Sequence, residues 1–124
     1  MLLVKTRIDR SPIHGLGLYA AEPIRRGTRV WSFTPGLDLD LDPSCLDLLT
    51  PEQRQRLLDY GYIDPRLGRF ILCCDDARFI NHSDTPNIAP EFDKEGHGID
   101  IAVRDIAEGE EITADYGIVE GARP

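Results

Sequence analysis

Residues 78–87 read RFINHSDTPN, and this stretch joins an apolar lead-in to a dense run of amide, imidazole, hydroxyl and carboxylate groups. Such groups are costly to bury unless each one finds a hydrogen-bond partner, so they indicate a built site or a braced loop. Residues 109–117 read GEEITADYG and end a predicted strand on Tyr116, followed by Gly117 where the backbone must bend. Near the N-terminus, residues 14–19 read HGLGLY. We expect these three stretches to build one pocket.

The three stretches, in this order and spread from residue 14 to residue 117, resemble the motifs of the SET-domain family of protein lysine methyltransferases. The resemblance implies a mainly β fold of several small β-sheets with one short helix. It also implies a C-terminal segment threaded beneath a preceding loop, which is a rare exception to the no-threading rule. We expect residues 1–124 to form a single SET domain, with its core at 3–117 and a short tail at 118–124.

Position 84 separates this chain from many eukaryotic members of the family. Those members carry Cys there, as part of a zinc site completed by a cysteine-rich tail, whereas this chain has Asp84 and no Cys after Gly117. The chain is therefore similar to compact microbial and viral SET proteins without that tail, and no metal site is expected. Cys45, Cys73 and Cys74 form no ligand pattern, because adjacent residues of a strand point to opposite faces.

The resemblance implies S-adenosyl-L-methionine as the cofactor. The residues that match the family's cofactor contacts are His14, Gly15, Leu16, Gly17, Asn81, His82 and Tyr116. By itself a pair of glycines usually marks an ordinary tight turn, since glycine tolerates positive φ. Asn81 offers both donors and acceptors, which a cofactor with an ammonium, a carboxylate and an adenine requires. The alternative is that Asn81 and His82 only brace a buried loop by hydrogen bonds.

Tyr116 is the expected catalytic residue. Methyl transfer from a sulfonium is an in-line displacement, so the amine must arrive neutral and on axis, and such positioning is worth up to ~7–11 kcal/mol. A phenol held near the methyl group can orient the amine. Without the resemblance, Tyr116 would be interpreted as an aromatic residue at a strand end that packs on the core.

The resemblance places Tyr60, Tyr62 and Phe70 near the entry for the substrate lysine. Aromatic walls suit an alkylammonium group, with cation–π contributions of ~0.5–2 kcal/mol, but simple core packing is the alternative. Thr34 stands where some members carry the Tyr of a Tyr-x-Gly motif, which leaves the methylation level open. We expect a methyltransferase acting on the ε-amine of lysine in a protein; the alternative is a catalytically weak or inactive SET-like module that binds basic protein tails.

The net charge of −8, with acidic residues concentrated between Asp38 and Asp47, opposes direct nucleic-acid binding, which requires a basic face. An acidic rim instead suits a basic protein or peptide as partner, although the charge could serve solubility alone. No apolar stretch approaches the ~20 residues of a membrane span, and the start is too short for a signal peptide. We expect an intracellular, cytoplasmic protein, with the nucleus as the alternative. Exposed apolar residues between Leu37 and Leu49 could form a homodimer interface.

One helix is well signalled, from about Pro51 to Tyr60. Thr50 is a good N-cap, Pro51 fits the first helical position and Gln53 completes a capping box, while Gly61 predicts the end. Strands are expected at 2–8, 28–33, 37–43, 69–74, 88–92 and 98–103, followed by one that ends near residue 113. The segment 37–43 should form either an edge strand or an extended loop with one exposed face, 88–92 and 98–103 should form a hairpin, and 75–80 should form a short helical turn.

Overall fold

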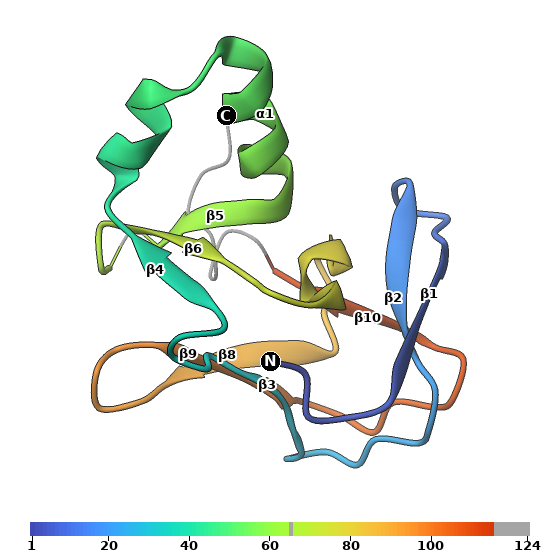
Figure 1. Cartoon of the computed structure of the whole chain (residues 1–124). Coiled ribbons are helices and arrows are strands. Elements are labelled where there is room, and N and C mark those ends of the chain that lie inside the picture. The colour runs from blue at the N-terminus through green and yellow to red at the C-terminus, as the bar shows by residue number, and fades with distance from the viewer. Residues whose placement is uncertain (65, 116–124) are drawn as a thin grey trace.

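A computed structural model describes residues 1–64 and 66–115, and its strands gather in three small sheets (Figure 1). The elements are β1 (Thr6–Arg10), β2 (Leu16–Ala20), β3 (Arg29–Ser32), β4 (Leu39–Leu41), the 3-10 helix η1 (Pro43–Leu48), α1 (Pro51–Tyr60), β5 (Gly61–Asp64), β6 (Arg69–Leu72), the 3-10 helix η2 (Asp76–Phe79), β7 (Asn81–His82), β8 (Ile88–Phe92), β9 (Gly98–Ala102) and β10 (Glu111–Ala114). The strand orders are β1-β2-β10-β7, β3-β9-β8 and β4-β6-β5. The predicted mainly β fold of small sheets is confirmed.

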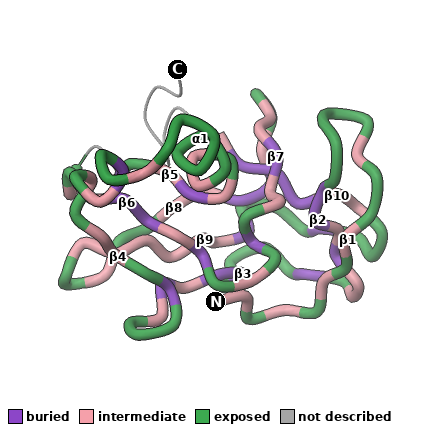
Figure 2. The backbone as a smooth tube through the Cα atoms, turned by 45° about the horizontal axis from the view of Figure 1, so that its top comes forward, coloured by how far each residue is buried: buried purple, intermediate pink, exposed green. Residues whose placement is uncertain are grey.

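The main hydrophobic core joins sheet β1-β2-β10-β7 to sheet β3-β9-β8. Its buried members are Leu18, Ala20, Ile24, Val30, Ile88, Ala102, Ile106, Ile112 and Ala114. Burying each large aliphatic side chain of this kind contributes about 1.5–3 kcal/mol, so this interface dominates the stability of the fold. A second cluster connects β3 to β6 and η2 through Trp31, Phe33, Ile71, Cys73 and Ala77. Figure 2 shows the buried segments concentrated along the central strands.

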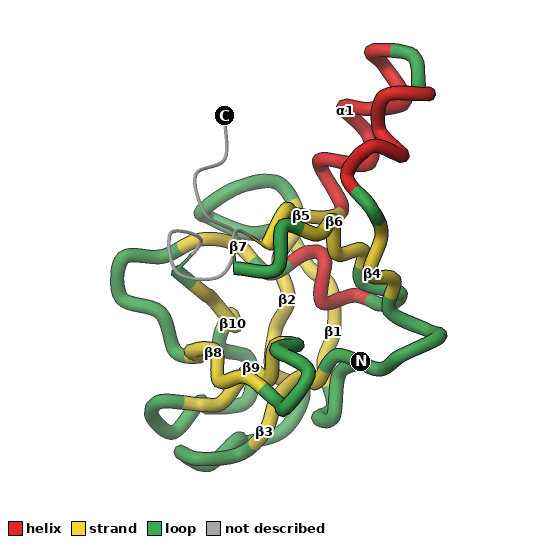
Figure 3. Tube along the Cα trace, turned by 90° about the vertical axis from the view of Figure 1, so that its left-hand side faces the viewer, coloured by secondary structure: helices red, strands yellow, loops and turns green. Residues whose placement is uncertain are grey.

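The helix α1 begins and ends where its sequence signals predict. The Thr50 hydroxyl accepts a hydrogen bond from the Gln53 amide at 3.2 Å, and the Gln53 side chain accepts one from the Thr50 amide at 3.1 Å. No residue of α1 is fully buried, and Figure 3 shows the helix projecting from the body of the molecule. Its caps therefore contribute more to its stability than they would in a helix with a buried face.

The remaining predictions are confirmed with shifted bounds. The hairpin is β8–β9, the helical turn is η2, and β4 lies at the edge of its sheet. The strand predicted at 2–8 begins only at Thr6 in the structure, where it is β1. Leu2 lies outside β1 and forms an isolated bridge with Trp31. The strands β2, β5 and β7 were not predicted. Cys73 is buried and Cys74 exposed, as expected for neighbours in an extended segment.

The sequence suggested a turn at both glycines of the HGLGLY stretch, and this was only half right. Gly15 has a positive φ of 45° and lies in the turn between β1 and β2. Gly17 lies within β2, opposite Asp9 of β1. Residues 116–124, which include the end of the C-terminal segment expected to thread beneath a loop, lie outside the described residues. Within the described part of the chain, no helix has the length and apolar character needed to cross a membrane.

Candidate functional site

Strand β10 brings the three motifs of the sequence together. It pairs antiparallel with β2, where Ile112 faces Leu18, and parallel with β7, where Thr113 faces Asn81. The HGLGLY stretch, the RFINHSDTPN stretch and the GEEITADYG stretch thus lie on neighbouring strands of one sheet. Residues about 65 and 30 positions apart in the chain become hydrogen-bond partners at this point. The prediction that these stretches meet is confirmed for the described residues.

Asn81 is the hub of this arrangement. Its side chain is almost fully buried, and Nδ2 lies 3.0 Å from each of three oxygens, which belong to the main chain of His14, the main chain of Leu16 and the side chain of Glu111. The two hydrogens of Nδ2 are therefore shared among three acceptors. None of the described residues donates a hydrogen bond to Oδ1 of Asn81, so this acceptor remains for a ligand.

The turn between β1 and β2 is held through its main chain. Asn81 contacts the carbonyl of His14, whereas the His14 residue is exposed. The main-chain amide of Ser11 also donates to the carbonyl of Gly15 at 2.8 Å. Nothing lies within 4 Å of the position where a Cβ on Gly15 would be, so the space beside the turn is open. A ligand could therefore approach the backbone closely.

Two residues of the site were missed by sequence reasoning, Ser11 and Glu111. The Ser11 hydroxyl lies 2.8 Å from both carboxylate oxygens of Glu111, and this carboxylate also accepts from Asn81. A signal was present in the alternation of β10, because Ile112 and Ala114 enter the core while Glu111 and Thr113 point to the opposite face. What the sequence could not show is that this face meets Asn81 and Gly17.

The rest of the RFINHSDTPN stretch braces β10. Asn87 is fully buried; its Nδ2 donates to the carbonyl of Glu111 at 2.8 Å and its Oδ1 accepts from the amide of Thr113 at 2.9 Å. The amide of Ser83 donates to the carbonyl of Ala114 at 3.0 Å. Asn87 and Ser83 thus brace β10, and these contacts leave Oδ1 of Asn81 available as an acceptor.

His82 lies between two carboxylates at the surface. Its Nε2 is 3.0 Å from Oδ1 of Asp84, and its Nδ1 is 3.9 Å from Oδ1 of Asp115. The ring is partly exposed beside the end of β10. This position is compatible with a ligand contact through either the ring or the main chain of His82.

The predicted substrate residues come from α1, β5 and β6 but do not form one continuous wall. Tyr62 pairs with Ile71 across strands β5 and β6, so both side chains lie on the same face of the sheet and pack against the second cluster. Phe70 is the neighbour of Ile71 in β6, so its side chain lies on the opposite face, where it is fully buried. Tyr60 is half-buried, and the guanidinium carbon of Arg78 lies 4.7 Å from its ring centroid. Tyr116, the expected catalytic residue, lies outside the described residues.

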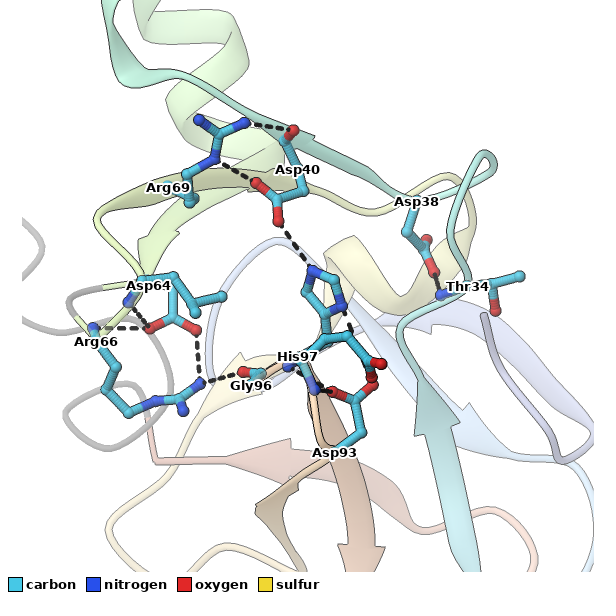
Figure 4. A network of polar contacts seen from close by, with 11 residues as sticks. Thr34, Asp38, Asp40, Asp64, Arg66, Arg69, Asp93, Gly96 and His97 are labelled. Carbon is cyan, nitrogen blue, oxygen red and sulfur yellow. Dashed lines mark hydrogen bonds and ion pairs between the residues drawn. The ribbon is translucent and has the colours of Figure 1, made fainter.

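A polar network joins sheet β4-β6-β5 to the β8–β9 hairpin (Figure 4). Asp40 accepts from Arg69 Nε at 2.5 Å and contacts His97 Nε2 at 2.8 Å. Arg69, together with His97, lowers the pKa of Asp40 despite partial burial. The His97 ring stacks on Phe33 with centroids 3.9 Å apart. These contacts set the orientation of the sheet that carries Tyr62 relative to the other sheets.

Thr34 belongs to the same region. Its amide donates to Asp38 at 2.8 Å, and its hydroxyl donates to the carbonyl of Ser32 at 3.1 Å. Because the hydroxyl is used locally, Thr34 does not replace the Tyr hydroxyl that some SET proteins carry at this position. Among the described residues, no group of three or more His, Cys, Asp or Glu side chains could hold a metal ion.

The sheet arrangement and the motif contacts define a SET-type β domain, and comparison with known proteins agrees. The SET domain family matches residues 15–117, and the chain belongs to this family. It is similar to Histone-lysine N-methyltransferase 2D of Homo sapiens, with 34% identity over 112 residues that cover 88% of this chain and 2% of that protein. It is also similar to the H3 lysine-4 specific histone-lysine N-methyltransferase of Neurospora crassa, with 32% identity over 129 residues, 89% of this chain and 9% of that protein. The chain thus spans only a small part of the length of these curated relatives.

Solved structures support the same fold. A chain of a humanized mutant of the Chaetomium thermophilum Polycomb Repressive Complex 2 matches with a TM-score of 0.65 at 24% identity, over 92% of this chain and 15% of that chain. A chain of an active polycomb repressive complex 2 in the basal state matches with a TM-score of 0.67 at 25% identity, over the same shares. The SET fold inferred from the motifs is therefore confirmed by structure as well as by sequence.

Proposed function

We propose that this chain is an S-adenosyl-L-methionine-dependent methyltransferase that acts on the ε-amine of lysine in a protein. The observation that carries the proposal is the convergence of the three motifs on Asn81, which holds the carbonyls of His14 and Leu16 at 3.0 Å. Membership of the SET-domain family supports it, as do the names of the relatives, which are histone-lysine N-methyltransferases.

The residues present fit this cofactor. Oδ1 of Asn81, which accepts no hydrogen bond from the described residues, can accept one from the ammonium of an amino acid. The open space beside Gly15 allows a ligand to reach the main chain at that residue. We assign His14, Gly15, Leu16, Gly17, Asn81, His82 and Tyr116 to cofactor binding. Bound there, S-adenosyl-L-methionine supplies an electrophilic methyl group on a positively charged sulfur.

On the substrate side, the work of the protein is to position a neutral amine. We assign Tyr116 to this role, because in the sequence it stands two positions after the last residue of β10, the strand that pairs with Asn81. Tyr60 and Tyr62 would line the approach of the lysine, and Phe70 would support their sheet from its buried face. The lysine proton would leave to solvent before transfer, since a nearby positive charge lowers the pKa of an amine.

The net charge of −8 favours a basic protein or peptide as substrate. The relatives' names point to histone tails as the class to test first, which would place the reaction in the nucleus rather than in the predicted cytoplasm. Leu37, Leu39 and Leu48 are 55%, 40% and 90% exposed, and a homodimer through them stays a prediction. That the chain does not bind nucleic acid directly also stays a prediction.

Incubation with labelled S-adenosyl-L-methionine and a pool of basic proteins tests the proposal. We expect label in protein, and we expect Tyr116→Phe to lower turnover strongly while affinity for S-adenosylhomocysteine, measured by calorimetry, stays within a few-fold. Turnover that is unchanged in Tyr116→Phe would reject the role of Tyr116. Binding of basic tails without transfer of label would instead support a catalytically weak or inactive module.

A further inference from the structure

We propose that Glu111 is a positioning residue for cofactor binding, acting through Ser11 and Asn81 on the β1–β2 turn (residues 11–15). This inference rests on the proposed function. Glu111 would touch neither cofactor nor substrate. Its role is to hold the turn and the Asn81 amide in the one arrangement that leaves Oδ1 of Asn81 free as an acceptor.

The position of Glu111 depends on Gly17. Glu111 is the first residue of β10 and faces Tyr19 of β2, and its side chain extends along β2 to lie over Gly17. A Cβ at position 17 would lie 2.5 Å from Oε2 of Glu111 and 3.0 Å from Cβ of Ser11. Only glycine leaves room for the carboxylate there, so the second glycine of the HGLGLY stretch serves this close approach and not a turn.

The carboxylate of Glu111 accepts hydrogen bonds from two side chains that hold the turn, Ser11 on one side and Asn81 on the other. On one side, the Ser11 hydroxyl donates to it at 2.8 Å and itself accepts from the amides of Ile13 at 3.0 Å and His14 at 3.4 Å. On the other side, Asn81 Nδ2 lies 3.0 Å from Oε2 and also contacts the turn carbonyl of His14. Donors and acceptors of the turn therefore both lead to one carboxylate. Hydrogen bonds to an ionised acceptor are about twice as strong as neutral ones.

This arrangement determines the orientation of the Asn81 amide. The Glu111 carboxylate and the carbonyls of His14 and Leu16 are acceptors only, so together they select Nδ2 and direct Oδ1 away. A Gln at position 111 would keep the size of the side chain but would present one donor and one acceptor. The carbonyls of His14 and Leu16 would still select Nδ2, but Ser11 and Asn81 could no longer each donate to an oxygen of their own at residue 111. The turn and the Asn81 amide would therefore be held less firmly. A loss of cofactor affinity without a loss of fold is the signature of such a role.

Calorimetric titration of the full chain with S-adenosylhomocysteine tests this inference. We expect Glu111→Gln to raise the Kd at least about tenfold and Ser11→Ala to raise it about threefold to tenfold. The double variant should lose less than the product of the two single effects, because both act through one hydrogen-bonded chain. In the methyl-transfer assay, the cofactor KM should rise while the peptide KM stays unchanged.

Glu108→Gln is the matched control, because Glu108 is an exposed carboxylate three positions before Glu111 in the sequence. The Kd of this control variant for S-adenosylhomocysteine should equal that of the wild type. Circular dichroism establishes that each variant is folded at the titration temperature. If Glu111→Gln does not fold, Ser11→Ala carries the test, because it removes a single hydroxyl. A Kd equal to that of the wild type in a folded Glu111→Gln variant, or in Ser11→Ala, would overturn this inference and leave the proposed function standing. Failure of the wild type to bind S-adenosylhomocysteine would overturn the proposed function and this inference with it.

Discussion

Replacing Asp100 with Asn is expected to change how the stability of the protein depends on pH. Asp100 lies in the middle of β9, where it faces Trp31 of β3 and Pro90 of β8. Among the described residues, none forms a hydrogen bond or an ion pair with its carboxylate. Burial raises the pKa of Asp100 from its ordinary value of 3.8 to about 7. The folded protein therefore prefers the protonated form, whereas the unfolded chain ionises near pH 4.

The sign and size of the effect follow from this difference. Protonation of Asp100 stabilises the folded state fully below about pH 4, and this contribution is lost as the pH rises through about 7. At 1.36 kcal/mol per pKa unit, the contribution changes by about 2.5 kcal/mol between pH 5 and pH 8. Because the side chain keeps partial contact with solvent, this figure is an upper bound. Asn has nearly the same shape and does not titrate.

Urea denaturation of both proteins at pH 5 and pH 8 measures the effect. The free energy of unfolding of Asp100→Asn, relative to that of the wild type, should increase by about 1–2.5 kcal/mol from pH 5 to pH 8. Other titrating groups are common to both proteins and cancel. Glu108→Gln, which neutralises an exposed carboxylate, serves as the control and should show a smaller change. Parallel pH profiles for Asp100→Asn and the wild type would refute the reasoning.

Two further predictions concern stability. Gly61→Ala should destabilise the protein by about 2 kcal/mol, because the new Cβ would lie 2.6 Å from the carbonyl oxygen of Ile71 and 2.6 Å from the Phe70 ring. The carbonyl belongs to the backbone of β6, so moving it away is costly. A denaturation midpoint equal to that of the wild type would contradict this prediction. Thr50→Ala should cost about 1 kcal/mol through loss of the N-cap, whereas Thr50→Ser should cost only a few tenths. Both are measured by urea denaturation, and equal losses in the Ala and Ser variants would argue against the cap.

The predictions from sequence succeeded where the signals are local. The bounds of α1 follow from Thr50, Pro51, Gln53 and Gly61, which act on the first and last turns of the helix itself. The β8–β9 hairpin was recognisable because its two strands are separated by a short polar loop. The strand β7, in contrast, has only two residues and exists through its pairing with β10. No local pattern marks such a strand.

The site divides in the same way. Asn81, His14 and Leu16 were predicted from their motifs, but the hydrogen bonds that join them to one another and to Glu111 were not, because the partners lie about 30 to 67 positions apart. Glu111 was part of a quoted motif and was still missed, because a carboxylate in a short strand usually faces solvent. Phe70 was predicted to meet a substrate, and its register in β6 buries it completely. Register depends on pairing, and pairing depends on contacts between distant segments.

By itself, the order of three short motifs determined the family, the class of fold and the residues proposed for the site. It could do so because backbone preferences and side-chain chemistry depend on residues that are close together in the sequence. Only the tertiary structure decided that β10 runs between β2 and β7, that Gly17 makes room for Glu111, and that Asn81 turns its amide nitrogen toward the protein. Those outcomes require main-chain hydrogen bonds and close packing between segments far apart in the chain, and no pattern within a single segment specifies them.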